Sequence, residues 1–363
     1  MRALVYHGPG ERAWDTVPDP EIVDPTDAVV RIDTSTICGS DLHILKGDVP
    51  ETPPGTVLGH EAVATVEAVG AGVTTVAPGD RVLVSCISAC GRCRFCKEAH
   101  YGQCLGGGGW VLGHTIDGLQ AEYARTPFAD TSLYKLPEAM SDEQVLFLSD
   151  ILPTSYEVGV LNGAVGPGDV LAVVGAGPIG LAAVLTAGLL SPSRIVVIDL
   201  DDGRLARARE FGADVTINNG REDAVARIME LTDGMGADVA LEAVGIAPTF
   251  ELAAELIRPG GHVANIGVHG HSACLHLETL WSRNVTITTG LVDTFTIPQL
   301  MKLVEQGRLD PTVLATHRYA LGDTMAAYDT FADAGTTGAL KVVLQGSGVT
   351  HAEPVEEAVL IAG

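Results

Sequence analysis

A glycine-rich turn, placed directly after an apolar run, constrains the fold more than any other feature. Val170–Val174 is apolar throughout, and Gly175-Ala-Gly-Pro-Ile-Gly180 follows it at once. In a strand–turn–helix unit the first glycine permits a tight bend, the second lets the backbone approach a pyrophosphate, and the third lets the helix pack on the strand. The free N–H groups at the helix N-terminus attract phosphate. We therefore predict a dinucleotide site formed by Gly175, Gly177, Pro178, Ile179 and Gly180.

An acidic residue further along the chain indicates which dinucleotide binds. Asp199 ends the next apolar run, about 20 residues past the first glycine, where a carboxylate contacts the ribose hydroxyls of NAD. The same carboxylate would repel the 2′-phosphate of NADP, whereas Arg204 can reach a phosphate. NAD is therefore the predicted cofactor. NADP, and a glycine-rich turn that binds no nucleotide, are the alternatives.

The pattern of apolar runs changes along the chain and predicts two domains. Up to residue 150, short alternating runs separated by Gly and Pro predict strands and loops. From Asp169 onward, apolar strands alternate with helices, which predicts an α/β fold with a doubly wound parallel sheet covered on both faces. Beyond residue 295 the order is mixed again. The length of 363 residues also exceeds what one ordinary core accommodates.

Four of the seven cysteines lie close together, in Cys90-x2-Cys93-x2-Cys96-x7-Cys104. Four thiolates in one loop can close tetrahedrally on a single Zn²⁺ and leave no position for substrate, so the site would be structural. Paired disulfides, unbound thiols and an iron–sulfur cluster are the alternatives. Cys86 and Cys274 match no such spacing, and we expect both to be buried small hydrophobes.

Other potential metal ligands are dispersed along the chain. Cys38 lies in Cys38-Gly-Ser-Asp-Leu-His43, His60 and Glu61 lie in Gly59-His-Glu61, and Asp150 ends the first predicted domain. A catalytic zinc needs mixed nitrogen, sulfur and oxygen ligands with one position open. Spacing alone does not join these residues, and each such residue type is more often structural than a ligand.

Several motifs follow one another along nearly the whole chain: Cys38-Gly-Ser-Asp-Leu-His43, Gly59-His-Glu61 with Gly70 and Val73 after it, Pro78-Gly-Asp-Arg-Val82, the four-cysteine loop and the turn at Gly175–Gly180. In this combination the chain resembles the medium-chain, zinc-dependent alcohol dehydrogenase family. The resemblance implies a GroES-like β-barrel catalytic domain, residues 1–150 and 295–363, and a Rossmann domain, residues 151–294. The active site would lie in the cleft between them.

The resemblance also groups the dispersed ligands. It makes Cys38, His60 and Asp150 the ligands of a catalytic zinc, with Glu61 as an exchangeable fourth ligand, so each chain would hold two zinc ions. Asp150 replaces a cysteine of the plant and animal branch. Together with the glutamate after the histidine, it resembles the bacterial secondary-alcohol dehydrogenase branch, which is often tetrameric. Trp110 then falls at a substrate-pocket position, with a core or interface tryptophan as the competing interpretation.

Residues for proton transfer and further cofactor contact follow from the same resemblance. Ser40 would accept the alcohol proton and His43 would pass it on through the cofactor ribose; a turn serine and a surface histidine are the alternatives. Lys341 would reach the pyrophosphate, unless it is simply solvated. The implied reaction is reversible hydride transfer between a small, secondary alcohol and NAD. A polyol or formaldehyde dehydrogenase of the same fold is the alternative.

Charge and composition limit the partners. The formal net charge of -24 repels a phosphate backbone, so small alcohols, aldehydes and ketones are expected and nucleic acid is not. Residues 170–190 carry no charge, but glycines and Pro178 interrupt them, so no membrane partner is expected. The clustered cysteines and the absence of a secretory signal predict a reducing cytoplasm. A homo-oligomer, dimer or tetramer, is expected from the resemblance alone.

Two further classes of protein compete with this interpretation. A zinc-free reductase of the same superfamily generally lacks Cys38 and the four-cysteine loop. A binding or structural protein on a retired enzyme fold has no reason to retain zinc ligands, a proton relay and an acidic ribose contact together. The combination therefore favours a zinc-dependent enzyme.

Overall fold

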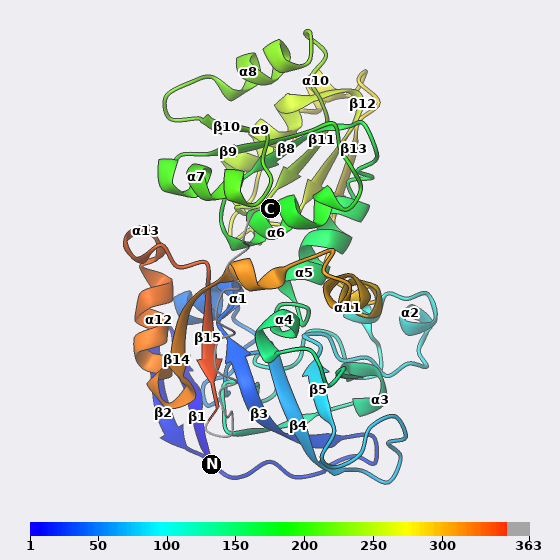
Figure 1. Ribbon diagram of the computed structural model, residues 1–363, viewed down its shortest axis with the longest axis vertical. Coiled ribbons are helices and arrows are strands. Elements are labelled where there is room, and N and C mark those ends of the chain that lie inside the picture. Colours follow the sequence, from blue (N-terminus) through cyan, green and yellow to red (C-terminus); the bar gives the residue numbers. More distant parts are fainter. Residues whose placement is uncertain (347–363) are drawn as a thin grey trace, which may run out of the picture.

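The computed structural model describes residues 1–346, which form two lobes stacked along the long axis of the molecule (Figure 1). The end of the predicted range 295–363 lies outside these residues. One lobe holds a six-stranded sheet and the other a seven-stranded sheet. Among the described residues, no helix combines the length and apolarity needed to cross a bilayer.

The six-stranded sheet is parallel throughout, with the order β10-β9-β8-β11-β12-β13. Its strands are β8 (Val170–Val174), β9 (Arg194–Asp199), β10 (Val215–Asn218), β11 (Ala237–Glu242), β12 (Ile257–Asn265) and β13 (Thr286–Thr289). The order reverses between β8 and β11, and ligands of such sheets bind at this switch point, beyond the carboxyl ends of the strands. The predicted doubly wound parallel sheet is confirmed.

Helices cover both faces of this sheet, which explains the apolar run in β8. Leu171 and Val173 belong to one buried cluster with residues of α6, whereas Ala172 and Val174 belong to another with residues of α8 and α9. A central strand buried on both faces needs apolar residues at successive positions. The helices of this lobe are α6 (Pro178–Gly188), α7 (Asp202–Glu210), α8 (Ala224–Leu231), α9 (Ala247–Leu256) and α10 (Leu277–Leu280).

The seven-stranded sheet combines strands from the first part of the chain with two strands from the last part of the described chain. Its order is β14-β15-β3-β4-β5-β7, with β6 paired to β3. Its strands are β3 (Ala28–Thr36), β4 (Ala62–Val69), β5 (Arg81–Val84), β6 (Tyr123–Thr126), β7 (Leu133–Lys135), β14 (Ala315–Ala320) and β15 (Lys341–Gln345). Figure 1 shows β15, in red, beside β3, in blue, and the two strands are antiparallel. Strands β14 and β15 therefore belong to the same sheet as β3.

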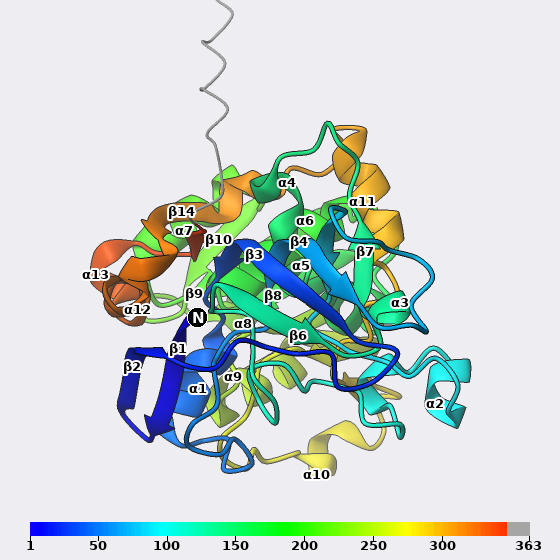
Figure 2. The same ribbon diagram turned by 90° about the horizontal axis from the view of Figure 1, so that it is seen from below.

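Shorter elements surround the second sheet. A hairpin of β1 (Arg2–Gly8) and β2 (Glu11–Thr16) packs at its side. The helical elements of this lobe are α1 (Gly39–Lys46), α2 (Arg94–Lys97), η1 (Tyr101–Gln103), α3 (Ala129–Ser132), α4 (Asp142–Leu146), α11 (Ile297–Glu305), η3 (Pro311–Leu314), η4 (Leu321–Asp323), α12 (Thr324–Ala332) and α13 (Ala334–Thr337). The segment that carries α2 projects from the lobe on one side (Figure 2).

The chain crosses between the lobes twice, and one buried carboxylate joins the two crossings. It leaves the lower lobe through α5 (Ile151–Thr154) and the π-helical segment η2 (Ser155–Leu161). Glu157 in η2 accepts hydrogen bonds from the backbone N–H groups of Asp293, Thr294 and Thr296, each at 2.9 Å. The hydrophobic core is continuous across this junction, so the domain limits at residues 150 and 295 stay a prediction.

Candidate metal centres and active-site cleft

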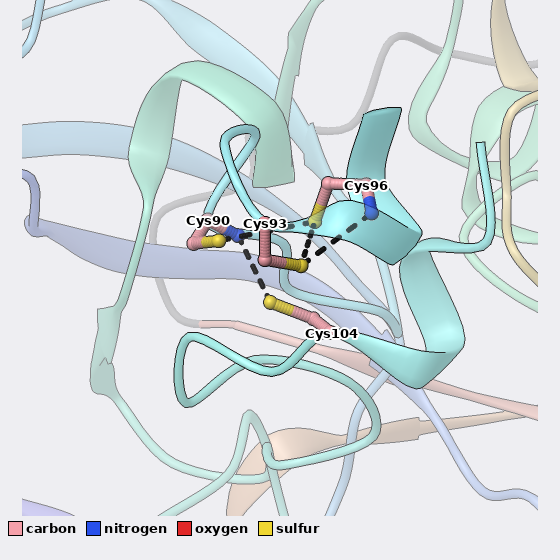
Figure 3. A group of neighbouring side chains, drawn as sticks. All are labelled: Cys90, Cys93, Cys96 and Cys104. Carbon is pink, nitrogen blue, oxygen red and sulfur yellow. Dashed lines mark hydrogen bonds between the residues drawn. The ribbon is translucent and has the colours of Figure 1, made fainter. Parts of the chain in front are cut away.

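Four cysteine sulfurs converge in the projecting segment around α2 (Figure 3). Sγ of Cys96 lies 3.4 Å from Sγ of Cys93 and 3.9 Å from Sγ of Cys90, and all four sulfurs, with Cys104, lie within 4.8 Å of one another. The backbone N–H groups of Cys96 and Leu105 point at Sγ of Cys93 and lower the pKa of its thiol to about 6. These N–H groups therefore stabilise the thiolate of Cys93, whereas burial raises the pKa of the Cys96 thiol to about 12.

The spacing of the sulfurs fits a single zinc ion. A tetrahedron with Zn–S bonds of about 2.3 Å has S···S edges of about 3.8 Å, close to the two separations above. No pair is a disulfide, since all four thiols are free, and the space enclosed suits one ion rather than a multi-iron cluster. A Cβ at Gly106 would lie 2.6 Å from Sγ of Cys90. A glycine there lets the chain close around the site.

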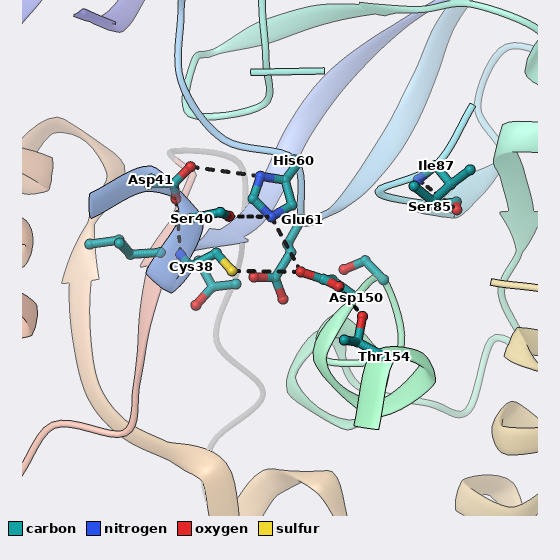
Figure 4. Close-up of polar contacts among 12 residues, drawn as sticks. Cys38, Ser40, Asp41, His60, Glu61, Ser85, Ile87, Asp150 and Thr154 are labelled. Atoms are coloured by element: carbon teal, nitrogen blue, oxygen red, sulfur yellow. Dashed lines mark hydrogen bonds and ion pairs between the residues drawn. The ribbon is translucent and has the colours of Figure 1, made fainter. Parts of the chain in front are cut away.

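A second cluster joins residues that lie far apart in the sequence (Figure 4). Cys38 precedes α1, His60 and Glu61 precede β4, and Asp150 precedes α5. Oδ2 of Asp150 lies 3.6 Å from Sγ of Cys38 and 3.3 Å from Nε2 of His60. One donor atom from each of the four residues falls within 4.8 Å of the others. This is the mixed sulfur, nitrogen and oxygen set that spacing alone does not join.

The electrostatics of this cluster favour a cation at its centre. Burial opposes a charged imidazole, but the hydrogen bonds to Asp150 and Cys38 raise the pKa of His60 well above its ordinary value. Burial likewise opposes a charged carboxylate, yet His60 lowers the pKa of Asp150 below its usual range. Thr154 donates to Oδ1 of Asp150 at 2.5 Å and holds that carboxylate in place. The cluster thus attracts positive charge in the position that a metal ion would take.

The proposed relay residues lie beside this cluster, on one face of α1. Ser40 and His43 are three residues apart, a spacing that places two side chains on the same side of a helix. Oγ of Ser40 lies 3.4 Å from Nε2 of His60. Nδ1 of His43 forms a 2.9 Å hydrogen bond with Oδ2 of Asp48. Ser40 and His43 both line the cleft described next.

A cleft of about 450 Å³ runs between the two lobes and reaches both the second cluster and the glycine-rich turn. Its walls include Cys38, Asp150, Pro178, Ile179 and Arg204. Trp110 also lines it, with its indole edge-on to the ring of His60 at 5.9 Å and stacked on the ring of His114 at 4.3 Å. One cavity therefore holds the candidate metal ligands, the predicted pocket tryptophan and the predicted dinucleotide turn.

The glycine-rich turn has the shape that a dinucleotide phosphate needs. Gly175 has φ +104°, which favours glycine, and a Cβ at Gly180 would lie 1.9 Å from the carbonyl oxygen of Gly175. A Cβ at Gly177 would instead meet nothing within 4 Å. The second glycine therefore keeps open space in front of the N-terminus of α6, where phosphate binds favourably.

Asp199 lies at the carboxyl end of β9, beside this turn. Its Oδ2 accepts from the backbone N–H of Ala176 at 2.7 Å, and Oδ1 accepts from those of Leu200 and Asp201 at 2.7 and 3.0 Å. A carboxylate has about four acceptor positions, so about one remains for a ribose hydroxyl. Three N–H groups fix the orientation of this carboxylate before any cofactor binds.

Comparison with known proteins agrees with this geometry. Residues 24–138 match the family described as "Alcohol dehydrogenase GroES-like domain", and residues 178–306 match "Zinc-binding dehydrogenase". The chain belongs to the medium-chain, zinc-dependent alcohol dehydrogenase family. The lower lobe is the GroES-like part and the upper lobe the Rossmann part, so the predicted fold class is confirmed.

Relatives align over nearly the full length of this alcohol dehydrogenase. An alcohol dehydrogenase of Cupriavidus necator is 37% identical over 366 residues, which cover 95% of this chain and 98% of the relative. The apo form of zinc-dependent alcohol dehydrogenase 2 from Streptococcus pneumonia superposes with a TM-score of 0.92 at 47% identity, covering 97% of this chain and 100% of that one. An alcohol dehydrogenase from Thermus sp. ATN1 superposes with a TM-score of 0.88 at 39% identity, covering 95% and 100%.

The alternative of a solvated Lys341 is wrong. Its ammonium is buried and donates to Oε1 of Glu61 at 2.6 Å and to the carbonyl oxygen of Ile37 at 3.0 Å. Lys341 also lines the cleft, and its contact with a pyrophosphate stays a prediction. A buried ammonium without a carboxylate beside it would be too costly, so the pair forms inside the lobe. Burial raises the pKa of Glu61 to about 6, while Lys341 opposes this shift.

The two cysteines outside the clusters differ from one another. Cys86 is buried on the wall of the cleft, as expected, and burial raises the pKa of its thiol well above the ordinary value. Cys274 is exposed, so its prediction as a buried hydrophobe is wrong. It lies in the segment between β12 and α10, which forms no strand or helix of its own.

Sequence reasoning missed Asp41 in the alcohol dehydrogenase site. Its Oδ2 accepts from the backbone N–H of Cys38 at 2.9 Å, and its Oδ1 lies 3.7 Å from Nδ1 of His60. Asp41 is completely buried. The spacing of Cys38 and Asp41 is that of an N-cap and the third helical residue, where acidic side chains commonly cap a helix. That spacing was the available signal.

Proposed function

We propose that this alcohol dehydrogenase transfers hydride reversibly between small secondary alcohols and NAD, with a catalytic zinc at Cys38, His60 and Asp150. One observation carries the proposal: the sulfur, nitrogen and oxygen donors converge on the wall of a cleft that also contains the glycine-rich turn. A second, structural zinc at Cys90, Cys93, Cys96 and Cys104 is part of the same proposal. Glu61 is an exchangeable fourth ligand, because Oε2 has no hydrogen-bond partner among the described residues.

The chain's own residues bind, orient and deprotonate the substrate. Bound zinc supplies Lewis acidity and NAD accepts the hydride. Ser40, next to His60, takes the alcohol proton as it releases its own hydroxyl proton, and His43, partly exposed and paired with Asp48, passes a proton on to solvent. Trp110 limits the size of the substrate and excludes water from its side of the cleft.

Steady-state kinetics test the function directly. Zinc-assayed protein is given primary alcohols, secondary alcohols, polyols and formaldehyde, with NAD and with NADP. We expect the highest kcat/KM with secondary alcohols and NAD, because the Asp199 carboxylate at the end of β9 repels a 2′-phosphate. Higher kcat/KM with polyols or with formaldehyde would favour the alternative enzymes of this fold. Turnover that survives complete removal of zinc would contradict the proposal.

Ser40→Ala tests the relay. We expect kcat to fall by about 10²- to 10⁴-fold, because a positioned general base typically contributes that much, while the zinc content stays unchanged. Ser193→Ala is the matched control, since Ser193 is exposed and its hydroxyl bonds only the carbonyl oxygen of Asp169. Near-normal turnover in Ser40→Ala would rule out the relay without affecting the zinc assignment.

We also propose a homo-oligomer, formed through the free edge of the upper sheet. β13 is the last strand of that sheet and pairs only with β12 among the described strands. Trp281 and Leu277, just before it, are 79% and 59% exposed. An open edge beside exposed apolar side chains favours pairing with a second copy. Light scattering during size-exclusion chromatography measures the oligomeric state; a monomer would contradict this proposal.

The thiolate-rich sites suit a reducing cytoplasm.

A further inference from the structure

A buried polar chain runs from α12 to His60, and the proposed reaction does not use its outer members. The hydroxyl of Tyr328 on α12 donates to Oε1 of Gln120 at 2.8 Å. Nε2 of Gln120 donates to Oδ2 of Asp41 at 3.1 Å and to the carbonyl oxygen of Thr36 at 3.1 Å. Tyr328, Gln120 and Asp41 are all completely buried. Solvent therefore does not compete for these bonds, which are strengthened by the low local dielectric.

The hydroxyl of Tyr328 fixes the direction of the Gln120 amide. While Oε1 accepts from the phenol, Nε2 faces Asp41 and the carbonyl oxygen of Thr36. A reversed amide would place Oε1 against a carboxylate oxygen and a carbonyl oxygen, which are acceptors without a proton to share. The phenol thus favours the one orientation in which Gln120 donates to Asp41.

Asp41 is then left with one free oxygen, and this oxygen faces His60. Oδ2 already accepts from Gln120 and from the backbone N–H of Cys38. Oδ1 of Asp41 and Nδ1 of His60 face one another at 3.7 Å, slightly beyond hydrogen-bond distance, and within residues 1–346 both atoms are buried and have no hydrogen-bond partner. A carboxylate only accepts, so Asp41 favours the tautomer of His60 with its proton on Nδ1. Where a metal ion is bound, Nε2 would then be the ligand atom, in place of its 3.3 Å hydrogen bond with Oδ2 of Asp150.

The glycine before His60 fits the same arrangement. Gly59 has φ +94°, and a Cβ there would lie 2.5 Å from Cγ of Gln120. The side chain of Gln120 therefore packs directly against the backbone that carries His60, and only glycine leaves room for it. The Gly59-His60 pair and Gln120 act as one packed unit.

We propose that Gln120 and Tyr328 are positioning residues that fix the tautomer and orientation of His60 through Asp41, and so set the affinity of the cluster for its metal. The inference rests on the proposed zinc site at Cys38, His60 and Asp150. Neither positioning residue lines the cleft, so their effect reaches the metal through Asp41. Residues behind a metal-bound histidine fix its ring and tautomer in this manner.

Tyr328→Phe tests the proposal with little disturbance of packing. The variant keeps the ring, including its contact with the guanidinium of Arg12 at 5.1 Å, and removes only the hydroxyl. Tyr319→Phe is the matched control, because it also loses one hydroxyl hydrogen bond, to Thr330 on the same helix. Competition with a chelator gives the affinities of the two zinc ions separately. We expect the zinc at Cys38, His60 and Asp150 to bind about 10-fold more weakly in Tyr328→Phe. Both zinc ions should bind normally in the control.

Gln120→Glu provides a second variant of nearly the same shape. It replaces the donor facing Asp41 with a carboxylate, so we expect a larger loss of affinity for the same zinc, of about 100-fold, while the four-cysteine site is unchanged. Unaltered affinity for both zinc ions in both variants would overturn the proposal. Equal weakening of both zinc ions would also overturn it, because such a result indicates general unfolding. Wild-type protein that binds no zinc at Cys38, His60 and Asp150 would instead contradict the proposed function itself.

Discussion

Cys38→Ser is expected to remove one of two zinc ions from each chain and to lower kcat/KM by about a thousandfold or more, which corresponds to about 4 kcal/mol of transition-state stabilisation. Cys38 is the sulfur donor of the second cluster, with Sγ 3.6 Å from Oδ2 of Asp150. A thiolate binds zinc as an anion, whereas a serine hydroxyl keeps its proton near neutral pH. Zinc analysis and steady-state rates measure the two effects.

Cys274→Ser is the matched control for this variant. It makes the same exchange of sulfur for oxygen at an exposed cysteine that belongs to neither cluster. We expect two zinc ions and wild-type rates. Full zinc content together with normal turnover in Cys38→Ser would contradict the assignment of the catalytic site, although it would leave the fold untouched.

Cys93→Ser is expected to remove the other zinc and to destabilise the protein strongly. The segment that carries the cage is mostly exposed, and of its four cysteines only Cys96 is buried. Such a segment has little apolar surface to bury, so bound metal replaces a core. At a free zinc concentration a thousandfold above Kd, the loss amounts to about 4 kcal/mol of unfolding free energy. Urea unfolding of zinc-loaded protein measures it.

The proposed zinc at Cys38, His60 and Asp150 distinguishes this loss of stability from a general loss of activity. The cage lies apart from the cleft, and none of its four cysteines lines it, so Cys93→Ser should retain one zinc and much of its turnover at low temperature. Removing zinc from wild-type protein with a chelator should reproduce the fall in stability. A variant that unfolds at the same urea concentration as wild type, with zinc in excess, would show that the cage has no structural role.

Much of the fold follows from local pattern. The apolar residues of β8 predict a strand buried on both faces, and the two clusters on either side of it bear this out. The apolar run that Asp199 is predicted to end is β9, Arg194–Asp199. Local pattern does not give the limits of an element where turn residues lie inside it: β12 begins at Ile257 and runs through Pro259 and Gly260. Pairing with β11 extends it.

The candidate sites also differ in how far the sequence predicts them. The four-cysteine cage and the glycine-rich turn each occupy one short segment, so their spacing predicts their geometry. Lys341 could not be placed from spacing, because its partner Glu61 lies 280 residues away. The exposure of Cys274 depends on what packs over its segment, which no local pattern records.

The sequence by itself determined the two ligand-binding segments, the alternation that builds the parallel sheet and the family. Only the tertiary structure decided that Asp150 meets Cys38 across 112 residues and that Tyr328 reaches Gln120 across 208. The physical reason is the range of the interactions. Ligands in one loop are held together by the covalent chain, whereas distant side chains meet only when whole sheets and helices have packed, and their contacts depend on that packing.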